Sequence, residues 1–385
     1  MIDQTDRPIS INVILMVAFI FTVIPAKADN IITQRINDFE MAFTNGKTVF
    51  KTIEERMSLH RVPGMSIAVI KNGQLHWAKG YGLQQANSDD FVDTDTVFSV
   101  GSISKVVTAA ITLRLVGKNI LDLDTDVNNY LTRWKIVENK YTAKQAVTLR
   151  HILSHTAGFN IHGFADFQPD EKLPTVIETL SGKSPAKHGP VKVGFVPGTN
   201  FKYSGGGITV EQLIIQEVTS KTFPDTAKHM VFNPLAMNRS TFLNPLPVSH
   251  GNIAKAHDKN GMPKALPRGW ESMPEMAASG LWTTPGDLAK LLIKLMQAYQ
   301  GKDAGFISNK LAIDMMSKAN SSEFGLGPEI SGINLFSHGG ANDSYNAFMM
   351  GNLQTGNAIV VLTNSVNGRR LCNEIIETMK QIEQW

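Results

Sequence analysis

Apolar positions along the chain form extended runs near both ends and helical spacings between them. The runs at 65–70 and 74–80 flank an Asn-Gly pair. This pair is the strongest short-range signal for a β-hairpin, because both residues tolerate a positive φ. Two further runs, at 345–350 and 358–363, are separated by a Gly-containing turn and predict a second pair of strands.

Helical spacing dominates the rest of the pattern. The segment 29–60 predicts an N-terminal helical region, and 369–384 carries an apolar stripe that predicts a C-terminal helix. Strands at both ends with helices between them predict an α+β fold, with an antiparallel sheet built from both chain ends and an inserted helical region. The helical runs of this middle region are 102–115, 149–154 and 210–219.

The N-terminus predicts a secretory signal. Residues 13–24 form a continuous apolar run, shorter than the roughly twenty residues that a helix needs to span a bilayer. Ala26-x-Ala28 has the small-x-small form of a cleavage site. We therefore expect a signal peptide, 1–28, followed by one domain, 29–385, in a secreted, periplasmic protein with no membrane span after cleavage. Two aspartates ahead of the apolar run are atypical and leave an uncleaved anchor as the alternative.

Composition narrows the class of protein. The chain has 385 residues, of which 42% are hydrophobic and 18% charged, enough for a large core. Its net charge of +3 is not concentrated in runs and gives no reason to expect a nucleic-acid partner. Cys372, the single cysteine, cannot form an internal disulfide. His151 and His155 are spaced like metal ligands on a helix, but no third ligand with recognisable spacing accompanies them. No metal or cofactor is expected.

The stretch Ser102-x-x-Lys105 carries the first candidate chemistry. It opens an apolar helical run, and residues three apart on a helix share a face. Ser102 would have a potential base one turn away and the unpaired N–H groups of a helix start beside it. This arrangement suits a serine that forms an acyl-enzyme.

The S-x-x-K pattern alone is weak, because a helix cap with a solvated lysine is the commoner origin of such a pair. Ser184-x-x-Lys187 also matches, in a polar stretch that predicts a loop. Further motifs in a fixed order distinguish the first match. They are the segments 148–158, 197–205, 278–289 and 337–340.

Together these motifs closely resemble those of the serine β-lactamase and penicillin-binding protein superfamily. The nearest branch is the class C β-lactamases with their esterase and D-aminopeptidase relatives, and the resemblance runs from about residue 45 to the C-terminus. It implies a sheet flanked by helices, an all-helical subdomain and an active-site groove between them. The sheet subdomain would comprise about 29–100 and 275–385, and the helical subdomain about 101–274.

The resemblance also implies roles for individual residues. Ser102 would be the nucleophile, and Lys105 with Tyr203 would move its proton, since a phenol beside an ammonium gives up its proton more easily. The backbone N–H groups of Ser102 and Ala341 would form the oxyanion hole, usually the largest single catalytic contribution. His338 would join the catalytic set as a mostly neutral side chain that can donate a hydrogen bond.

Glycines complete the expected site. Gly339 and Gly340 suit an edge strand that substrate backbone approaches closely. Gly205 lies where the family usually carries an asparagine, and His338 lies where β-lactamases usually carry a lysine. His155 and Gly158 resemble a scaffold element of the family. The departures at Gly205 and His338 disfavour efficient β-lactam hydrolysis.

The sequence therefore predicts a serine hydrolase that cleaves an ester or amide through an acyl-enzyme on Ser102. The substrate is expected to be a small molecule or peptide, with peptidoglycan-derived and D-amino-acid peptides among the candidates. A true β-lactamase or a penicillin-binding DD-peptidase stays open as an alternative, and so does a non-catalytic peptidoglycan-binding relative. Other hydrolase signatures, G-x-S-x-G and H-E-x-x-H, do not occur.

Overall fold

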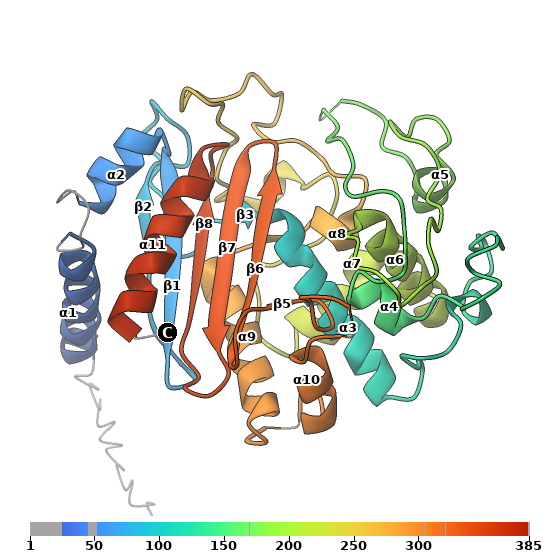
Figure 1. Cartoon of the computed structure of the whole chain (residues 1–385). Coiled ribbons are helices and arrows are strands. Elements are labelled where there is room, and N and C mark those ends of the chain that lie inside the picture. The colour runs from blue at the N-terminus through green and yellow to red at the C-terminus, as the bar shows by residue number, and fades with distance from the viewer. Residues whose placement is uncertain (1–24, 45–51, 169, 304, 320, 384–385) are drawn as a thin grey trace, which may run out of the picture.

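The computed structural model of the chain describes residues 25–44, 52–168, 170–303, 305–319 and 321–383. Within these residues, a six-stranded antiparallel sheet in the order β2-β1-β8-β7-β6-β5 forms the central layer (Figure 1). A short pair, β3 and β4, lies outside it. The strands are β1 (Gly64–Lys71), β2 (Gln74–Gly82), β3 (Phe98–Ser99), β4 (Trp282–Thr283), β5 (Glu329–Ile330), β6 (Leu335–Asn342), β7 (Tyr345–Asn352) and β8 (Ala358–Thr363).

The two chain ends meet in the middle of the sheet, which confirms the predicted α+β fold. β1 pairs with β2 on one side and with β8 on the other. Asn72 and Gly73 form the β1–β2 turn with φ of 52° and 71°, the positive values that an Asn-Gly turn accommodates. The C-terminal strands β7 and β8 then extend the sheet towards β6.

Helices cover both faces of the sheet and form a separate group on the side of β6 (Figure 1). The predicted N-terminal helical region is two helices, α1 and α2, and the predicted C-terminal helix is α11. The helices are α1 (Pro25–Thr44), α2 (Ile53–His60), α3 (Ser104–Gly117), α4 (Leu149–Leu153), α5 (Val176–Ser181), α6 (Gly205–Thr219), α7 (Phe223–Ala227), α8 (Met276–Ser279), α9 (Pro285–Tyr299), α10 (Asn309–Met315) and α11 (Gly368–Glu383).

Alternating side chains of β1 enter two different cores. Met65 and Ile67 pack in a cluster with Ile375 of α11, whereas Ala68 and Ile70 belong to the larger cluster that includes the apolar face of α9. Successive residues of a strand point to opposite faces, so α11 and α9 cover opposite faces of the sheet. A strand buried on both faces reads as a continuous apolar run rather than an alternation, as 65–70 does.

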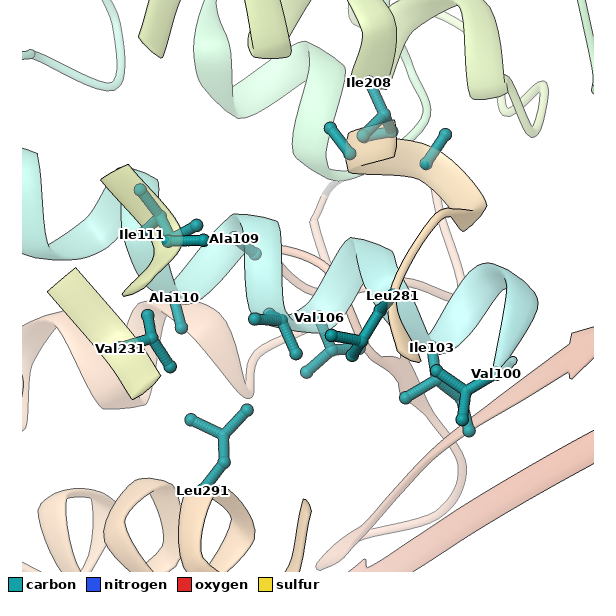
Figure 2. Packing of buried hydrophobic residues seen from close by; sticks show 14 of the residues in the cluster. Val100, Ile103, Val106, Ala109, Ala110, Ile111, Ile208, Val231, Leu281 and Leu291 are labelled. Atoms are coloured by element: carbon teal, nitrogen blue, oxygen red, sulfur yellow. The ribbon is translucent and has the colours of Figure 1, made fainter. Parts of the chain in front are cut away.

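The helix α3 is the centre of the larger core. Its side chains are buried almost all round, and Figure 2 shows Val106 and Ala109 among apolar residues from several other elements. Ile208 of α6 and Leu291 of α9 approach it from different sides (Figure 2). Burial on all sides fixes α3 in place, and its N-terminal end lies next to β6.

The predicted signal peptide falls mainly on 1–24, outside the described residues, and the predicted cleavage position Ala28 lies within α1. No helix in the described part of the chain is both long and apolar enough to cross a membrane.

Replacement of Gly340 by alanine should destabilise the fold, because a Cβ at this position would lie 1.9 Å from the carbonyl oxygen of Val100. We expect Gly340→Ala to lower the free energy of unfolding by about 1–3 kcal/mol, the usual range for overpacking. The neighbouring Gly339→Ala is the matched control, since its Cβ would lie 3.6 Å from Phe348 in ordinary contact. Urea denaturation of both variants tests this, and equal stabilities would contradict it.

Candidate active site

The Ser102-x-x-Lys105 pair is assembled at the end of α3 that faces β6. Ser102 lies in a 3₁₀ turn, Gly101–Ile103, and the α-helix begins at Ser104, two residues later than the predicted run. The Nζ of Lys105 donates to Ser102 Oγ at 3.0 Å and to the carbonyl oxygen of Ala278 at 2.8 Å. Lys105 is only 3% exposed, so it is a buried base candidate rather than a solvated surface lysine.

Tyr203 closes the same group of side chains. The Nζ of Lys105 lies 4.9 Å from the centroid of its ring. On its other side the ring packs against His155, with centroids 4.2 Å apart. His155 accepts a hydrogen bond at Nδ1 from the N–H of Ser204 (3.2 Å), and burial holds its pKa well below the usual range. A neutral, fixed His155 thus supports Tyr203 from behind, as expected for a scaffold residue.

The backbone of β6 is in close contact with the turn that carries Ser102. The backbone nitrogen of Ala341 lies 2.6 Å from the position of a Cβ on Gly101, a residue with φ of 49°. The backbone nitrogen of Ser102 lies 3.1 Å from the position of a Cβ on Gly340. The two amides assigned to the oxyanion hole therefore belong to backbone segments in close contact, an approach that only glycine permits.

Two cavities meet at the predicted nucleophile. Ser102, Tyr203 and Ala341 line both, together with His162 from the loop after α4. The first cavity, of about 320 Å³, extends past Lys105 and Gly205. The second, of about 390 Å³, extends past His338, Gly339, Gly340 and two phenylalanines. A larger surface hollow of about 660 Å³ beside Arg133 contains none of the predicted site residues.

Gly205 has a packing reason to be a glycine. It begins α6, and its N–H donates to the carbonyl oxygen of His162 at 2.8 Å. A Cβ on Gly205 would approach that same oxygen to 3.0 Å. The loop at His162 thus crowds the first carbon of any side chain at this position, and the carbonyl of Ala278 holds Lys105.

His338 is neutral, and its one hydrogen-bond donor contacts the backbone rather than either cavity. It is 3% exposed, and burial together with the nearby Lys105 lowers its pKa to about 4. Its Nδ1 lies 2.7 Å from the carbonyl oxygen of Gly339. A carbonyl only accepts, so Nδ1 carries the proton and Nε2 keeps a lone pair. Among the described residues Nε2 has no hydrogen-bond partner, so His338 offers an acceptor.

Three carboxyl groups that line the first cavity were not predicted from the sequence: Asp166, Glu275 and Asp343. Asp166 accepts a hydrogen bond from the N–H of Asp343 at 3.2 Å, and Glu275 accepts one from the hydroxyl of Ser279 at 2.6 Å. Burial raises the pKa of Asp166 to about 8 and that of Glu275 to about 7. They come from three separate segments, and no motif links them. The only indication in the sequence was that these three residues lie close along the chain to residues of the motifs.

The other candidates from the sequence have separate locations. Ser184 is exposed and lines neither cavity at Ser102. His151 takes part in the N-terminal cap of α4, where its Nδ1 accepts a hydrogen bond from the N–H of Thr148 at 3.3 Å. The described residues contain no group of three or more His, Cys, Asp or Glu side chains that could hold a metal ion. Cys372, by contrast, belongs to the lining of the second cavity, and its burial in α11 raises the pKa of its thiol to about 12.

Comparisons with known proteins agree with this geometry. Residues 49–377 match the family model described as Beta-lactamase. The chain is 25% identical over 324 residues to "Protein flp" of Staphylococcus aureus (strain N315), covering 82% of this chain and 62% of that protein. It is 28% identical over 239 residues to "Unguisins hydrolase ungD'" of Aspergillus campestris, covering 60% of this chain and 43% of that protein. The chain thus spans less than two thirds of the length of either relative.

A solved structure shares the fold. The penicillin-binding protein homologue from Pyrococcus abyssi matches with a TM-score of 0.66 at 23% identity, covering 83% of this chain and 74% of that one. At this identity the likeness concerns the fold.

The neutral His338 should make the protein less stable in acid. Its folded-state pKa of about 4 lies below the ordinary 6.5, so between these values the unfolded chain binds a proton that the folded chain does not. This contribution to stability is complete above pH 6.5 and is lost as the pH falls towards 4. When the pH falls from 7 to 4.5, the free energy of unfolding of the wild type should decrease by about 2 kcal/mol more than that of His338→Gln. The exposed His229→Gln is the control and should follow wild type. Equal losses in wild type and His338→Gln, measured by urea denaturation, would refute this.

Proposed function

The chain belongs to the Beta-lactamase family, and from this premise we propose that it is a serine hydrolase that forms an acyl-enzyme on Ser102. The observation that carries the proposal is the 3.0 Å contact between Lys105 Nζ and Ser102 Oγ, at the junction of two cavities. A nucleophile and a base within hydrogen-bond distance are the signature of an activated serine.

The proposed reaction moves one proton in each of its two stages. Lys105 and Tyr203 together take the proton as Ser102 Oγ attacks the substrate carbonyl. The N–H groups of Ser102 and Ala341 receive the negative charge that develops on the carbonyl oxygen. Lys105 and Tyr203 then return the proton to the leaving oxygen or nitrogen as its bond to carbon breaks. Water then attacks the resulting ester on Ser102, and Lys105 and Tyr203 take a proton from that water. They return it to Ser102 Oγ as the bond between Oγ and the acyl carbon breaks, which releases the acid and restores the serine.

The charges around Ser102 favour an ester or amide without a carboxylate over a β-lactam antibiotic. A penicillin or cephalosporin carries a carboxylate near its reactive ring. In the second cavity His338 is neutral and presents a lone pair, and Arg369 and Glu329 supply one charge of each sign. The first cavity is lined by three carboxyl groups. The carboxyl groups of the first cavity disfavour an anion there. Gly205 also lacks the amide that the related β-lactamases use.

Two further parts of the proposal have support outside the site. One relative carries the name of a hydrolase, "Unguisins hydrolase ungD'", which supports hydrolysis as the reaction type. The apolar run at 13–24 and the small-x-small site at Ala26 and Ala28 support export to the periplasm.

Ser102→Ala should abolish labelling by a fluorophosphonate, whose phosphorus is attacked by the activated serine with loss of fluoride. The matched control is Ser184→Ala, the serine of the second S-x-x-K, which should label like wild type. Lys105→Met should slow labelling by roughly 10²–10⁴-fold, the usual contribution of a general base. Intact mass spectrometry gives the readout. Labelling that persists in Ser102→Ala would place the nucleophile elsewhere, and an unlabelled, folded wild type would favour a non-catalytic relative.

Restoring the family's asparagine at Gly205 should not create a β-lactamase. Because a Cβ there would approach the carbonyl oxygen of His162 to 3.0 Å, Gly205→Asn should be destabilised by about 1–3 kcal/mol without faster hydrolysis of a chromogenic cephalosporin. Gly163→Asn makes the same change in the same cavity wall, where nothing lies within 4 Å of the new Cβ. It should keep wild-type stability. A stable Gly205→Asn that hydrolyses the cephalosporin faster would overturn this explanation.

A further inference from the structure

The first cavity at Ser102 has an acidic end that the proposed reaction does not use. Glu275 is 4% exposed, Asp166 is half-buried and Asp343 is exposed, so the three carboxyls run from the floor of the cavity to its rim. Glu275 lies at the start of α8, Asp166 in the loop after α4 and Asp343 in the β6–β7 turn. The only cationic side chain among the described lining residues is that of Lys105.

The floor of this cavity contains an unsatisfied acceptor. The Oε1 of Glu275 accepts from Ser279, whereas its Oε2 is buried without a hydrogen-bond partner among the described residues. A buried polar atom without a partner is unfavourable. Since Glu275 lines an open cavity, a hydrogen-bond donor arriving through that cavity would satisfy it.

Cations around the acidic end are engaged in other contacts. Lys105 donates to Ser102 and to a backbone carbonyl. Lys187 donates to the carbonyl oxygen of Asp166 and to the carboxylate of Glu171. Lys264 pairs with Glu271, a further carboxylate nearby, at 2.6 Å.

Burial disfavours the charged forms of Asp166 and Glu275, and repulsion by neighbouring carboxylates adds to the effect at Asp166. The pKa values are raised to about 8 for Asp166 and about 7 for Glu275. A bound cation would relieve both effects.

We propose that this cavity binds a primary ammonium group of the substrate, with Glu275 at its floor and Asp166 and Asp343 nearer its mouth. The inference rests on the proposed serine hydrolase and specifies its substrate class, an ester or amide with an amine on one arm. An ammonium has three donors and no acceptor, which matches a wall of carboxyl oxygens. The volume of about 320 Å³ suits a short arm, since one water occupies about 30 Å³ in the liquid.

The test uses substrates that differ only in charge. For the acyl arm, the p-nitroanilides of 3-aminopropanoate and butanoate exchange an ammonium for a methyl group. For the leaving arm, butanoate esters of 4-(aminomethyl)phenol and 4-ethylphenol do the same. In one of the two pairs, we expect kcat/KM to be about tenfold or more higher for the ammonium member, because its neutral analogue leaves buried polar groups unpaired.

The ratio of kcat/KM between the two members of that pair should fall towards one in Glu275→Gln, Asp166→Asn and Asp343→Asn. The exposed Asp343→Asn keeps the test valid if the buried Glu275→Gln fails to fold. Asp170→Asn is the matched control for Asp166→Asn, because it removes a carboxyl group from the same loop at an exposed position outside the cavity. Its ratio should equal that of wild type. Equal rates within both pairs, or a preference that survives Asp166→Asn and Asp343→Asn, would overturn the proposal.

Calorimetry separates this inference from the proposed hydrolysis. Ser102→Ala in the full chain should bind n-propylammonium and not propionate, and adding Asp343→Asn should weaken the binding severalfold. If wild type hydrolyses none of the substrates, the proposed function fails while this binding still tests the ammonium site. Failure of n-propylammonium to bind Ser102→Ala would refute the ammonium site even if the enzyme hydrolyses neutral esters.

Discussion

The close approach of β6 to the turn before α3 is the constraint on which the rest of the site depends. Gly340 meets the carbonyl of Val100, and Gly101 meets the backbone of Ala341, at distances where neither position has room for a Cβ. This contact joins the sheet, built from both chain ends, to the buried helix that carries Lys105. It brings two backbone amides from distant segments to one point, which a preorganised oxyanion hole requires.

The two cavities at Ser102 differ in the hydrogen-bonding groups they offer. One ends at carboxyl groups and includes the unpartnered Glu275, and the other contains a neutral His338 whose proton is held by a backbone carbonyl. A buried site has little water to compensate for mismatched groups, so such differences select substrates strongly. The site therefore combines the motif residues Ser102, Lys105 and Tyr203 with two cavities that differ in the hydrogen-bonding groups of their walls.

Local patterns predicted those parts of the molecule that depend on neighbours in sequence. The Asn-Gly turn at Asn72, the strands at the chain ends and the helical spacing of Ser102 and Lys105 all follow from short-range chemistry. The acidic group at Asp166 and Glu275 could not be predicted, because its members lie about a hundred residues apart and only tertiary packing joins them. The acceptor that His338 presents could not be predicted either, because the backbone contact that occupies its donor, Nδ1–H, depends on the local backbone geometry of β6.

The most direct test of the account is rapid-quench mass spectrometry of the wild-type protein during turnover of a short-chain p-nitrophenyl ester. Acid quenching traps the intermediate, and peptide mapping identifies the residue that carries the acyl group. The account predicts a mass increase equal to the acyl group on the peptide that contains Ser102. Ester turnover with the acyl group on another residue, or with unmodified Ser102 at every quench time, would contradict it.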